Sequence, residues 1–121
     1  MNTISRRNIL IRAMASLVAM ASAPLLVYPA RGNASSPKMH YVEISGFNFN
    51  PEVLAVKPGD AIIWANLDIA PHTATALDNS WDTGTIAQGK SHEIQVTRNF
   101  SPEYFCRFHP QMLAKLRIST S

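Results

Sequence analysis

Cysteine is nearly absent from this chain of 121 residues, in which Cys106 is the only one. A haem-c attachment motif needs two cysteines before a histidine, and a dinuclear copper centre needs two bridging thiolates. The sequence therefore excludes both kinds of site. A single thiol in an oxidising compartment is buried and inert, bonded to another chain, or bound to a metal.

Charged residues are also few, at 16%, against 46% hydrophobic residues, a balance typical of a folded domain. The formal net charge of +3 is unevenly distributed, because residues 1–34 contain four arginines and no acidic residue, whereas residues 35–121 contain seven basic and eight acidic residues. The sequence shows no basic stripe interleaved with aromatic residues. We therefore expect no nucleic-acid partner.

No long hydrophobic run is present either, since the apolar run at 13–27 is short for a membrane span and is interrupted by Ser and Pro. It follows SRRNIL at 5–10, which matches a twin-arginine export signal, and precedes the small residues GNA at 32–34. We predict a twin-arginine-type signal peptide at 1–34, export to the periplasm, and a mature domain at 35–121 without an integral membrane segment. An ordinary secretory signal or an uncleaved anchor is the alternative.

The mature region lacks a helical period over any ten residues. It consists instead of short alternating or β-rich runs separated by turn residues, such as the KPGD sequence at 57–60. Many short strands at short spacing predict a single all-β domain, an antiparallel sandwich or barrel. The expected strands lie at 40–44, 53–56, 61–66, 73–77, 92–96, 103–106 and 114–118.

One cluster of residues predicts a metal site. Cys106 is followed by His109 and then by Met112 at steps of three, and His72 lies in the segment after the run at 61–66. Loops at one end of a sandwich can bring these side chains together. Thiolate and thioether suit copper, and Cys-His-His with a weak Met is the blue-copper electron-transfer arrangement, whereas zinc prefers a fourth strong ligand. A buried structural thiol is the alternative for Cys106 alone.

The stretches FNFNPEVLAVKPGDAIIWANLDIAPHTAT and YFCRFHPQM resemble the cupredoxins, above all the amicyanins and their plastocyanin and pseudoazurin relatives. The resemblance covers most of residues 40–118 and implies a cupredoxin-like Greek-key β-sandwich of about seven to eight strands. It also implies one type 1 copper ion per chain, with His72, Cys106 and His109 as strong ligands and Met112 as the weak axial ligand.

The resemblance implies two supporting residues as well. The side chain of Asn66 would tie the two ligand loops together, and the backbone N–H of Thr73 would donate to the cysteine sulfur. Bonds of this kind hold the geometry of a metal site and tune its potential.

Other polar and aromatic residues have ordinary interpretations. His92 shares one side of its expected strand with two aliphatic residues, which predicts a packed or half-buried side chain, whereas we expect His40 to be exposed. Trp64 and Trp81 are expected in or against the core. Tyr104 is expected to anchor a corner of the sandwich through its hydroxyl.

Together these features predict a monomeric, periplasmic blue copper protein that carries single electrons between redox proteins, such as dehydrogenases or c-type cytochromes. We predict no enzymatic activity, since no His-x-His pair provides a second copper site. The alternative is copper storage or delivery, although only two methionines follow residue 34. Partners would dock weakly on an apolar patch around the edge of His109, formed by Ala70, Pro71, Phe108 and Pro110, with Arg107 nearby to steer an acidic partner.

Overall fold

The computed structural model describes residues 18–29 and 36–120. The chain divides into two units, Met1–Gly32 and Asn33–Ser121, and residues 18–29 have no regular secondary structure. The predicted twin-arginine motif at 5–10 and the predicted cleavage position after Ala34 lie outside the described residues. In the described ranges, no helix is long and apolar enough to cross a membrane.

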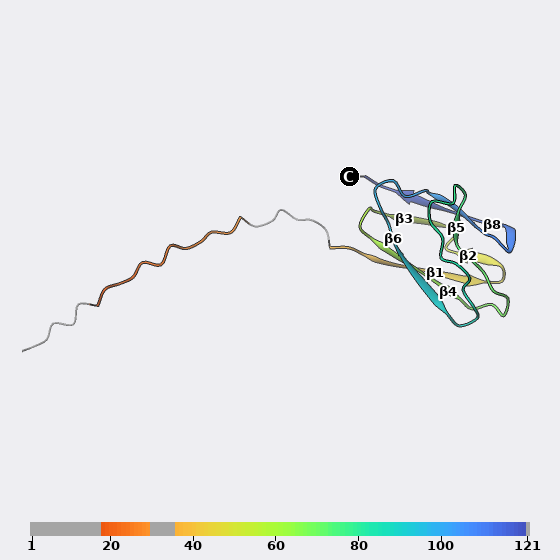
Figure 1. The fold of residues 1–121 in the computed structure, drawn as a ribbon, viewed down its shortest axis with the longest axis horizontal. Helices are drawn as coiled ribbons and strands as arrows, with labels where there is room; N and C mark the ends of the chain where they lie inside the picture. The colour runs from red at the N-terminus through yellow and green to blue at the C-terminus, as the bar shows by residue number, and fades with distance from the viewer. Residues whose placement is uncertain (1–17, 30–35, 121) are drawn as a thin grey trace, which may run out of the picture. The chain divides into compact units, whose positions relative to one another are not determined.

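The second unit is a sandwich of two four-stranded sheets (Figure 1). One sheet has the order β2-β1-β4-β6 and the other has the order β3-β8-β7-β5. The all-β prediction is confirmed, with eight strands. They are β1 (Met39–Ser45), β2 (Asn48–Asn50), β3 (Val53–Val56), β4 (Ala61–Asn66), β5 (Thr75–Ala76), β6 (Ser91–Gln95), β7 (Glu103–Cys106) and β8 (His109–Ile118).

The strand boundaries follow the sequence pattern in part. The runs at 53–56, 61–66 and 103–106 form strands with those bounds, whereas the run at 73–77 contributes only two residues to β5. Strand β8 begins at His109 and not at 114, because a two-residue turn brings His109 into register opposite Cys106. The short strand β2 was not predicted.

Both sheets are mixed, so the expectation of antiparallel pairing throughout is wrong. Strand β1 pairs in parallel with β4, and β3 pairs in parallel with β8, while the other ladders are antiparallel. The chain leaves the first sheet after β2, adds β3 to the second sheet, and returns to the first at β4. This crossover makes β1 and β4 parallel neighbours, which the strand pattern alone does not predict.

An aromatic cluster forms much of the core between the sheets. Trp64 stacks on Trp81 with ring centroids 5.4 Å apart, and Trp81 stacks on Phe100 at 4.7 Å. Trp64 and Trp81 are both buried, as predicted. Tyr104 is buried against the same rings, but its hydroxyl has no hydrogen-bond partner among the described residues. The predicted hydroxyl anchor is therefore wrong, because the side chain packs among the rings of the aromatic cluster.

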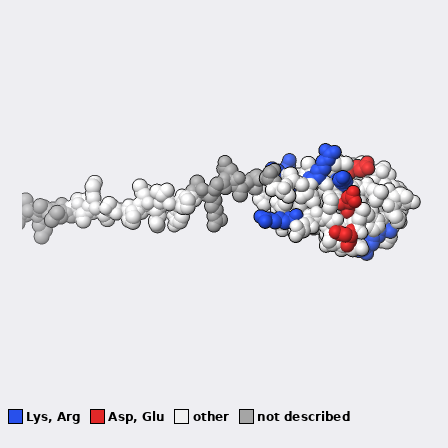
Figure 2. Space-filling view, turned by 90° about the horizontal axis from the view of Figure 1, so that it is seen from above, with Lys and Arg blue, Asp and Glu red and all other residues white. Residues whose placement is uncertain are grey.

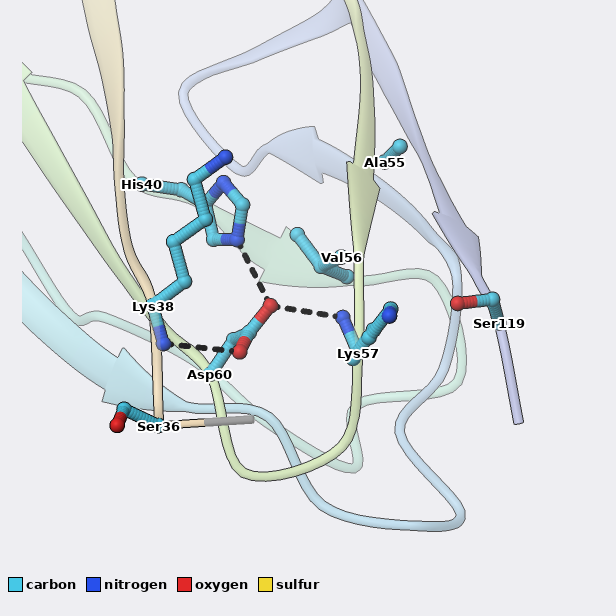
Figure 3. A pocket seen from close by; sticks show the side chains of 8 residues that line it. All are labelled: Ser36, Lys38, His40, Ala55, Val56, Lys57, Asp60 and Ser119. Atoms are coloured by element: carbon cyan, nitrogen blue, oxygen red, sulfur yellow. Dashed lines mark hydrogen bonds and ion pairs between the residues drawn. The ribbon is translucent and has the colours of Figure 1, made fainter. Parts of the chain in front are cut away.

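The two histidines outside the predicted site also differ from expectation. His92 is exposed, because it lies on β6 at the edge of its sheet. His40 is largely buried, with its Nε2 atom 2.8 Å from Asp60 Oδ2 (Figure 3). The Asp60 carboxylate also accepts hydrogen bonds from the backbone N–H groups of Lys38 and Lys57. The aspartate of the KPGD turn thus connects that turn to the start of β1.

Charged side chains of both signs are interspersed over the face of the domain that Figure 2 shows. On this face the lysine and arginine side chains form no continuous stripe among the described residues. This distribution agrees with the near balance of basic and acidic residues after position 34.

Candidate metal centre

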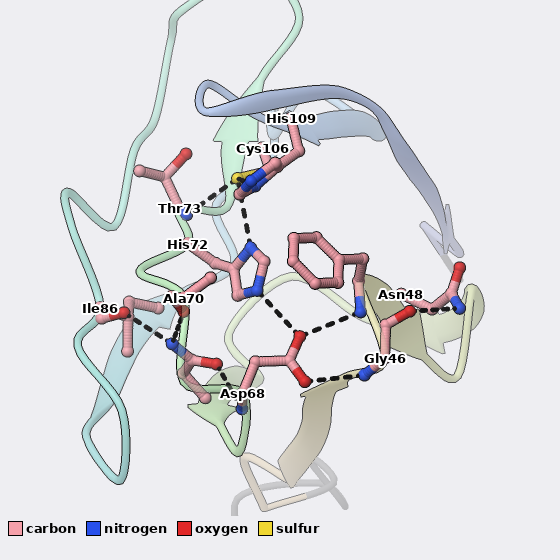
Figure 4. A network of polar contacts seen from close by, with 11 residues as sticks. Gly46, Asn48, Asp68, Ala70, His72, Thr73, Ile86, Cys106 and His109 are labelled. Carbon is pink, nitrogen blue, oxygen red and sulfur yellow. Dashed lines mark hydrogen bonds and ion pairs between the residues drawn. The ribbon is translucent and has the colours of Figure 1, made fainter.

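The structure brings three of the four predicted ligands together (Figure 4). His72 lies in the loop after β4, Cys106 is the last residue of β7, and His109 is the first residue of β8. The Cys106 sulfur is 3.7 Å from His72 Nδ1 and 3.6 Å from His109 Nδ1. The three ligand atoms all lie within 4.8 Å of one another, close enough to bind one ion.

The three residues of the cluster differ in their exposure to solvent. His72 and Cys106 are fully buried, whereas His109 is half-buried. The two imidazole centroids are 4.9 Å apart, with their planes tilted by 55°. Backbone hydrogen bonds in both directions between His72 and Ile86 fix the loop that contains the buried histidine. His109 therefore provides the accessible edge of the cluster.

Met112 is buried on β8, three residues after His109. It shares the buried side of this strand with Ala114 and Leu116, since burial alternates along β8 from Met112 onwards. The axial role of Met112 remains a prediction.

Thr73 links the two ligand segments. Its backbone N–H donates to the Cys106 sulfur at 3.3 Å, the contact that the sequence resemblance implies. Its hydroxyl oxygen accepts a hydrogen bond from the Arg107 N–H at 3.0 Å and lies 2.9 Å from Thr75 Oγ1. The loop that follows β4 is thereby connected to the end of β7.

Asn66 is fully buried and makes three hydrogen bonds near the His72 loop. Its Nδ2 donates to the carbonyl oxygens of Ala70 and Ile86, each at 2.9 Å, and its Oδ1 accepts from the Asp68 N–H. These bonds hold the His72 loop against the segment around Ile86. The link between the two ligand loops that was expected of Asn66 is made by Thr73 instead.

Asp68 was missed in the sequence, although it lies four residues before His72. Its Oδ2 atom is 2.9 Å from His72 Nε2, and its carboxylate accepts hydrogen bonds from the N–H groups of Gly46 and Phe47. The Phe47 N–H lowers the pKa of Asp68 against the opposing effect of burial, with further lowering by Gly46 and His72. An ionised Asp68 holds the Nε2–H tautomer of His72 and leaves its Nδ1 lone pair facing Cys106.

Phe47 was missed as well. It follows Gly46 in the two-residue turn between β1 and β2, and both residues have positive φ angles, 57° for Phe47 and 59° for Gly46. This backbone fits the twist of a tight hairpin, but for a phenylalanine it costs about 1 kcal/mol or more. The Phe47 ring lies edge-to-face with both imidazoles, with centroids 5.2 Å from His72 and 4.8 Å from His109.

The residues of the predicted docking patch are accessible. Pro71, Phe108 and Pro110 are exposed and Ala70 is half-buried. Arg107, which was expected to steer partners, forms an ion pair with Asp82. Its charge is therefore partly neutralised within the domain.

The donor set decides which metal the cluster fits. Two imidazole nitrogens and one buried sulfur suit zinc or copper. The cluster has three members, with no fourth His, Cys, Asp or Glu among the described residues, and Met112, three residues after His109 in the sequence, would be a poor zinc ligand. The residues therefore fit a single type 1 copper ion, which takes His₂Cys with a weak thioether.

Comparisons with known proteins establish the fold. No family model and no curated protein sequence matches the chain. A variant of amicyanin in the Cu(I) form matches with a TM-score of 0.60 and 21% identity, over 67% of this chain and 82% of that chain. The chain has the cupredoxin fold. A second Cu(I) amicyanin variant matches with a TM-score of 0.58 and 22% identity, over 73% and 87% of the two chains.

The cupredoxin fold also occurs in a larger match. A Cu-containing nitrite reductase from Thermus scotoductus SA-01 is 25% identical, with a TM-score of 0.61 over 70% of this chain. The match spans 23% of the nitrite reductase chain, so it concerns one part of that enzyme.

Proposed function

We propose that this protein carries single electrons through one type 1 copper ion bound by His72, Cys106 and His109, with Met112 as the weak axial ligand. One observation carries the proposal: a fully buried cysteine sulfur lies within 3.7 Å of the Nδ1 atoms of two histidines. Copper bound there would supply the Cu(II)/Cu(I) couple. The copper-bound states of the amicyanin and nitrite reductase neighbours support the choice of metal.

The surrounding residues suit an electron carrier because they hold the ligands rigidly. Asp68 fixes the ring of His72. The Thr73 N–H donates a hydrogen bond to the Cys106 sulfur, and the Thr73 hydroxyl accepts one from the N–H of Arg107, the residue after Cys106. Ligands that are already held in place move little when the charge of the site changes. A small rearrangement gives a low barrier to electron transfer, whereas a delivery site needs ligands that release the metal.

The partners we propose are redox proteins, of the dehydrogenase or cytochrome c class, that dock at the half-buried edge of His109. The apolar and accessible character of the surrounding patch supports brief, weak association with a monomeric carrier. The patch consists of Ala70, Pro71, Phe108 and Pro110. We place the carrier in the periplasm, with residues 1–34 as a twin-arginine-type signal peptide and 35–121 as the copper domain.

We propose a carrier and not an enzyme, although one neighbour is a nitrite reductase. Among the described residues, His72, Cys106 and His109 are the only cluster of at least three His, Cys, Asp or Glu side chains that could hold a metal. These residues thus offer one three-ligand site, which suits a carrier with a single copper ion.

Voltammetry of the copper-loaded protein tests the proposal against copper storage or delivery. We expect a reversible one-electron wave, rapid electron exchange between oxidised and reduced protein, and retention of copper through repeated cycles. His109→Ala, which removes the accessible imidazole, should slow the exchange or abolish the wave, while Tyr41→Ala, an exposed aromatic residue outside the site, should not. Loss of copper on reduction, with ready transfer to a chelator, would favour the delivery alternative.

A further inference from the structure

Phe47 covers the two histidines of the metal centre from the β1–β2 turn. Its ring is nearly perpendicular to both imidazoles, with interplanar angles of 88° to His72 and 90° to His109. The residue is 49% exposed, while His72 behind it has no exposed surface. The ring centroid of Phe47 lies 5.2 Å from that of His72 and 4.8 Å from that of His109. The phenyl group thus separates this part of the site from solvent.

The backbone that carries this ring is held by the same residue that contacts His72. The Asp68 carboxylate accepts the Gly46 N–H at 2.8 Å and the Phe47 N–H at 2.9 Å, and it also contacts His72 Nε2. Successive N–H groups in a tight turn form a concave site that favours an anion. Asp68 fills it and so stabilises the left-handed backbone at Phe47. One carboxylate therefore holds both the His72 imidazole and the turn backbone that carries the Phe47 ring.

We propose that the Phe47 ring shields the His72–Cys106–His109 site and keeps small exogenous ligands such as azide from reaching it. This inference rests on the proposed copper function. A carrier site must keep the same ligands in both oxidation states, so an anion or water that binds the metal would interfere with electron transfer. The apolar surroundings of a metal site control such access. Because the Phe47 ring packs against both imidazoles, it would block one path by which a small ligand could reach the metal between them.

An azide titration of the copper-loaded full chain tests this inference. The change in the visible thiolate-to-copper band would be measured in the wild type, Phe47→Gly, Phe47→Tyr and Tyr41→Ala. Glycine adopts the left-handed backbone readily and removes only the ring, so this variant should fold. We expect Phe47→Gly to bind azide at least roughly tenfold more tightly than the wild type.

The other variants separate a missing ring from a general disturbance. Phe47→Tyr keeps the ring and should exclude azide as the wild type does. Tyr41→Ala loses an aromatic residue from β1 that is 66% exposed and should also behave as the wild type. Phe47→Ala provides a second ring-free variant if the glycine variant loads copper poorly.

Two results must be distinguished. A wild type without a thiolate-to-copper band would overturn the proposed function, and with it the site that Phe47 is proposed to close. A wild type with the band, but with the same azide affinity as Phe47→Gly and Phe47→Ala, would overturn the role of Phe47 alone.

Discussion

The backbone N–H of Thr73 lies 3.3 Å from the Cys106 sulfur and donates a hydrogen bond to it, across 33 residues of sequence. This contact joins the loop after β4 to the end of β7, and both atoms are buried. A donor to a thiolate stabilises negative charge on the sulfur. In the proposed copper site that charge is greater in the Cu(I) state, so the bond should raise the reduction potential.

Removal of this donor should therefore lower the potential. Thr73→Pro lacks the N–H, and we expect a potential lower by roughly 60 mV, which corresponds to about 1.4 kcal/mol for one electron. Thr73→Ala is the matched control, because it loses the hydroxyl and keeps the N–H. Voltammetry of both variants provides the comparison. Equal potentials in the two variants would show that the N–H does not stabilise the thiolate.

Asn66 should be essential for the stability of the His72 loop. Asn66→Ala removes three hydrogen bonds at a fully buried position and leaves the carbonyl oxygens of Ala70 and Ile86 without this donor. We expect the metal-free protein to lose about 2–4 kcal/mol of unfolding free energy, measured by urea denaturation. Asn99→Ala, at an exposed position, should change it by less than about 0.5 kcal/mol. Similar values for the two variants would contradict the assigned role.

Asp60 should make stability depend on pH under acidic conditions. Burial would raise the pKa of Asp60, but hydrogen bonds with His40 and with the Lys38 and Lys57 N–H groups outweigh it and lower the pKa from 3.8 to about 2. The carboxylate binds protons less readily in the folded state. Asp60 therefore contributes up to about 2 kcal/mol to the free energy of unfolding above pH 3.8, and this contribution is lost as the pH falls towards 2.

Denaturation of the metal-free protein at several pH values tests this linkage. Asp60→Asn should be less stable than the wild type at pH 6, and the difference should shrink as the pH approaches about 2. Glu43→Gln changes an exposed carboxylate on β1 and controls for the general effect of charge. A difference between wild type and Asp60→Asn that stays constant across this range would contradict the assignment.

The substitution Tyr104→Phe should change the free energy of unfolding very little. Burial raises the pKa of Tyr104 to about 12, and among the described residues neither its hydroxyl nor the buried Trp64 Nε1 has a partner with hydrogen-bond geometry. Removal of an unpaired buried hydroxyl leaves stability within about 1 kcal/mol of the wild type or increases it. Tyr104→Ala should lose about 3–5 kcal/mol, since it leaves a cavity in the aromatic cluster. A large loss in the phenylalanine variant would show that the hydroxyl is bonded after all.

The sequence predicted those features that depend on neighbouring residues. Alternating residues and the KPGD turn determine β4 at its observed bounds, and the steps of three residues after Cys106 place His109 in contact with it through a short turn. The cysteine and its histidine are close because a two-residue turn allows no other arrangement. The chemistry of the donor set then points to copper.

Other contacts depend on the register of strands that are far apart in the sequence. Asp68 reaches Phe47 only because parallel pairing sets Ile44 of β1 beside Asn66 of β4, which brings the β1–β2 turn next to the loop that contains Asp68 and His72. His40 meets Asp60 for the same reason at the other end of the same ladder, where Met39 pairs with Ala61. No local pattern specifies such a register, so these residues were missed or misjudged.

The copper-binding role proposed for His72, Cys106 and His109 is tested most directly by the visible absorption spectrum of the full chain after addition of an equimolar amount of Cu(II). We expect an intense blue or green thiolate-to-copper band that is absent from Cys106→Ala. A colourless protein, or a pale spectrum identical in wild type and Cys106→Ala, would contradict the proposed role.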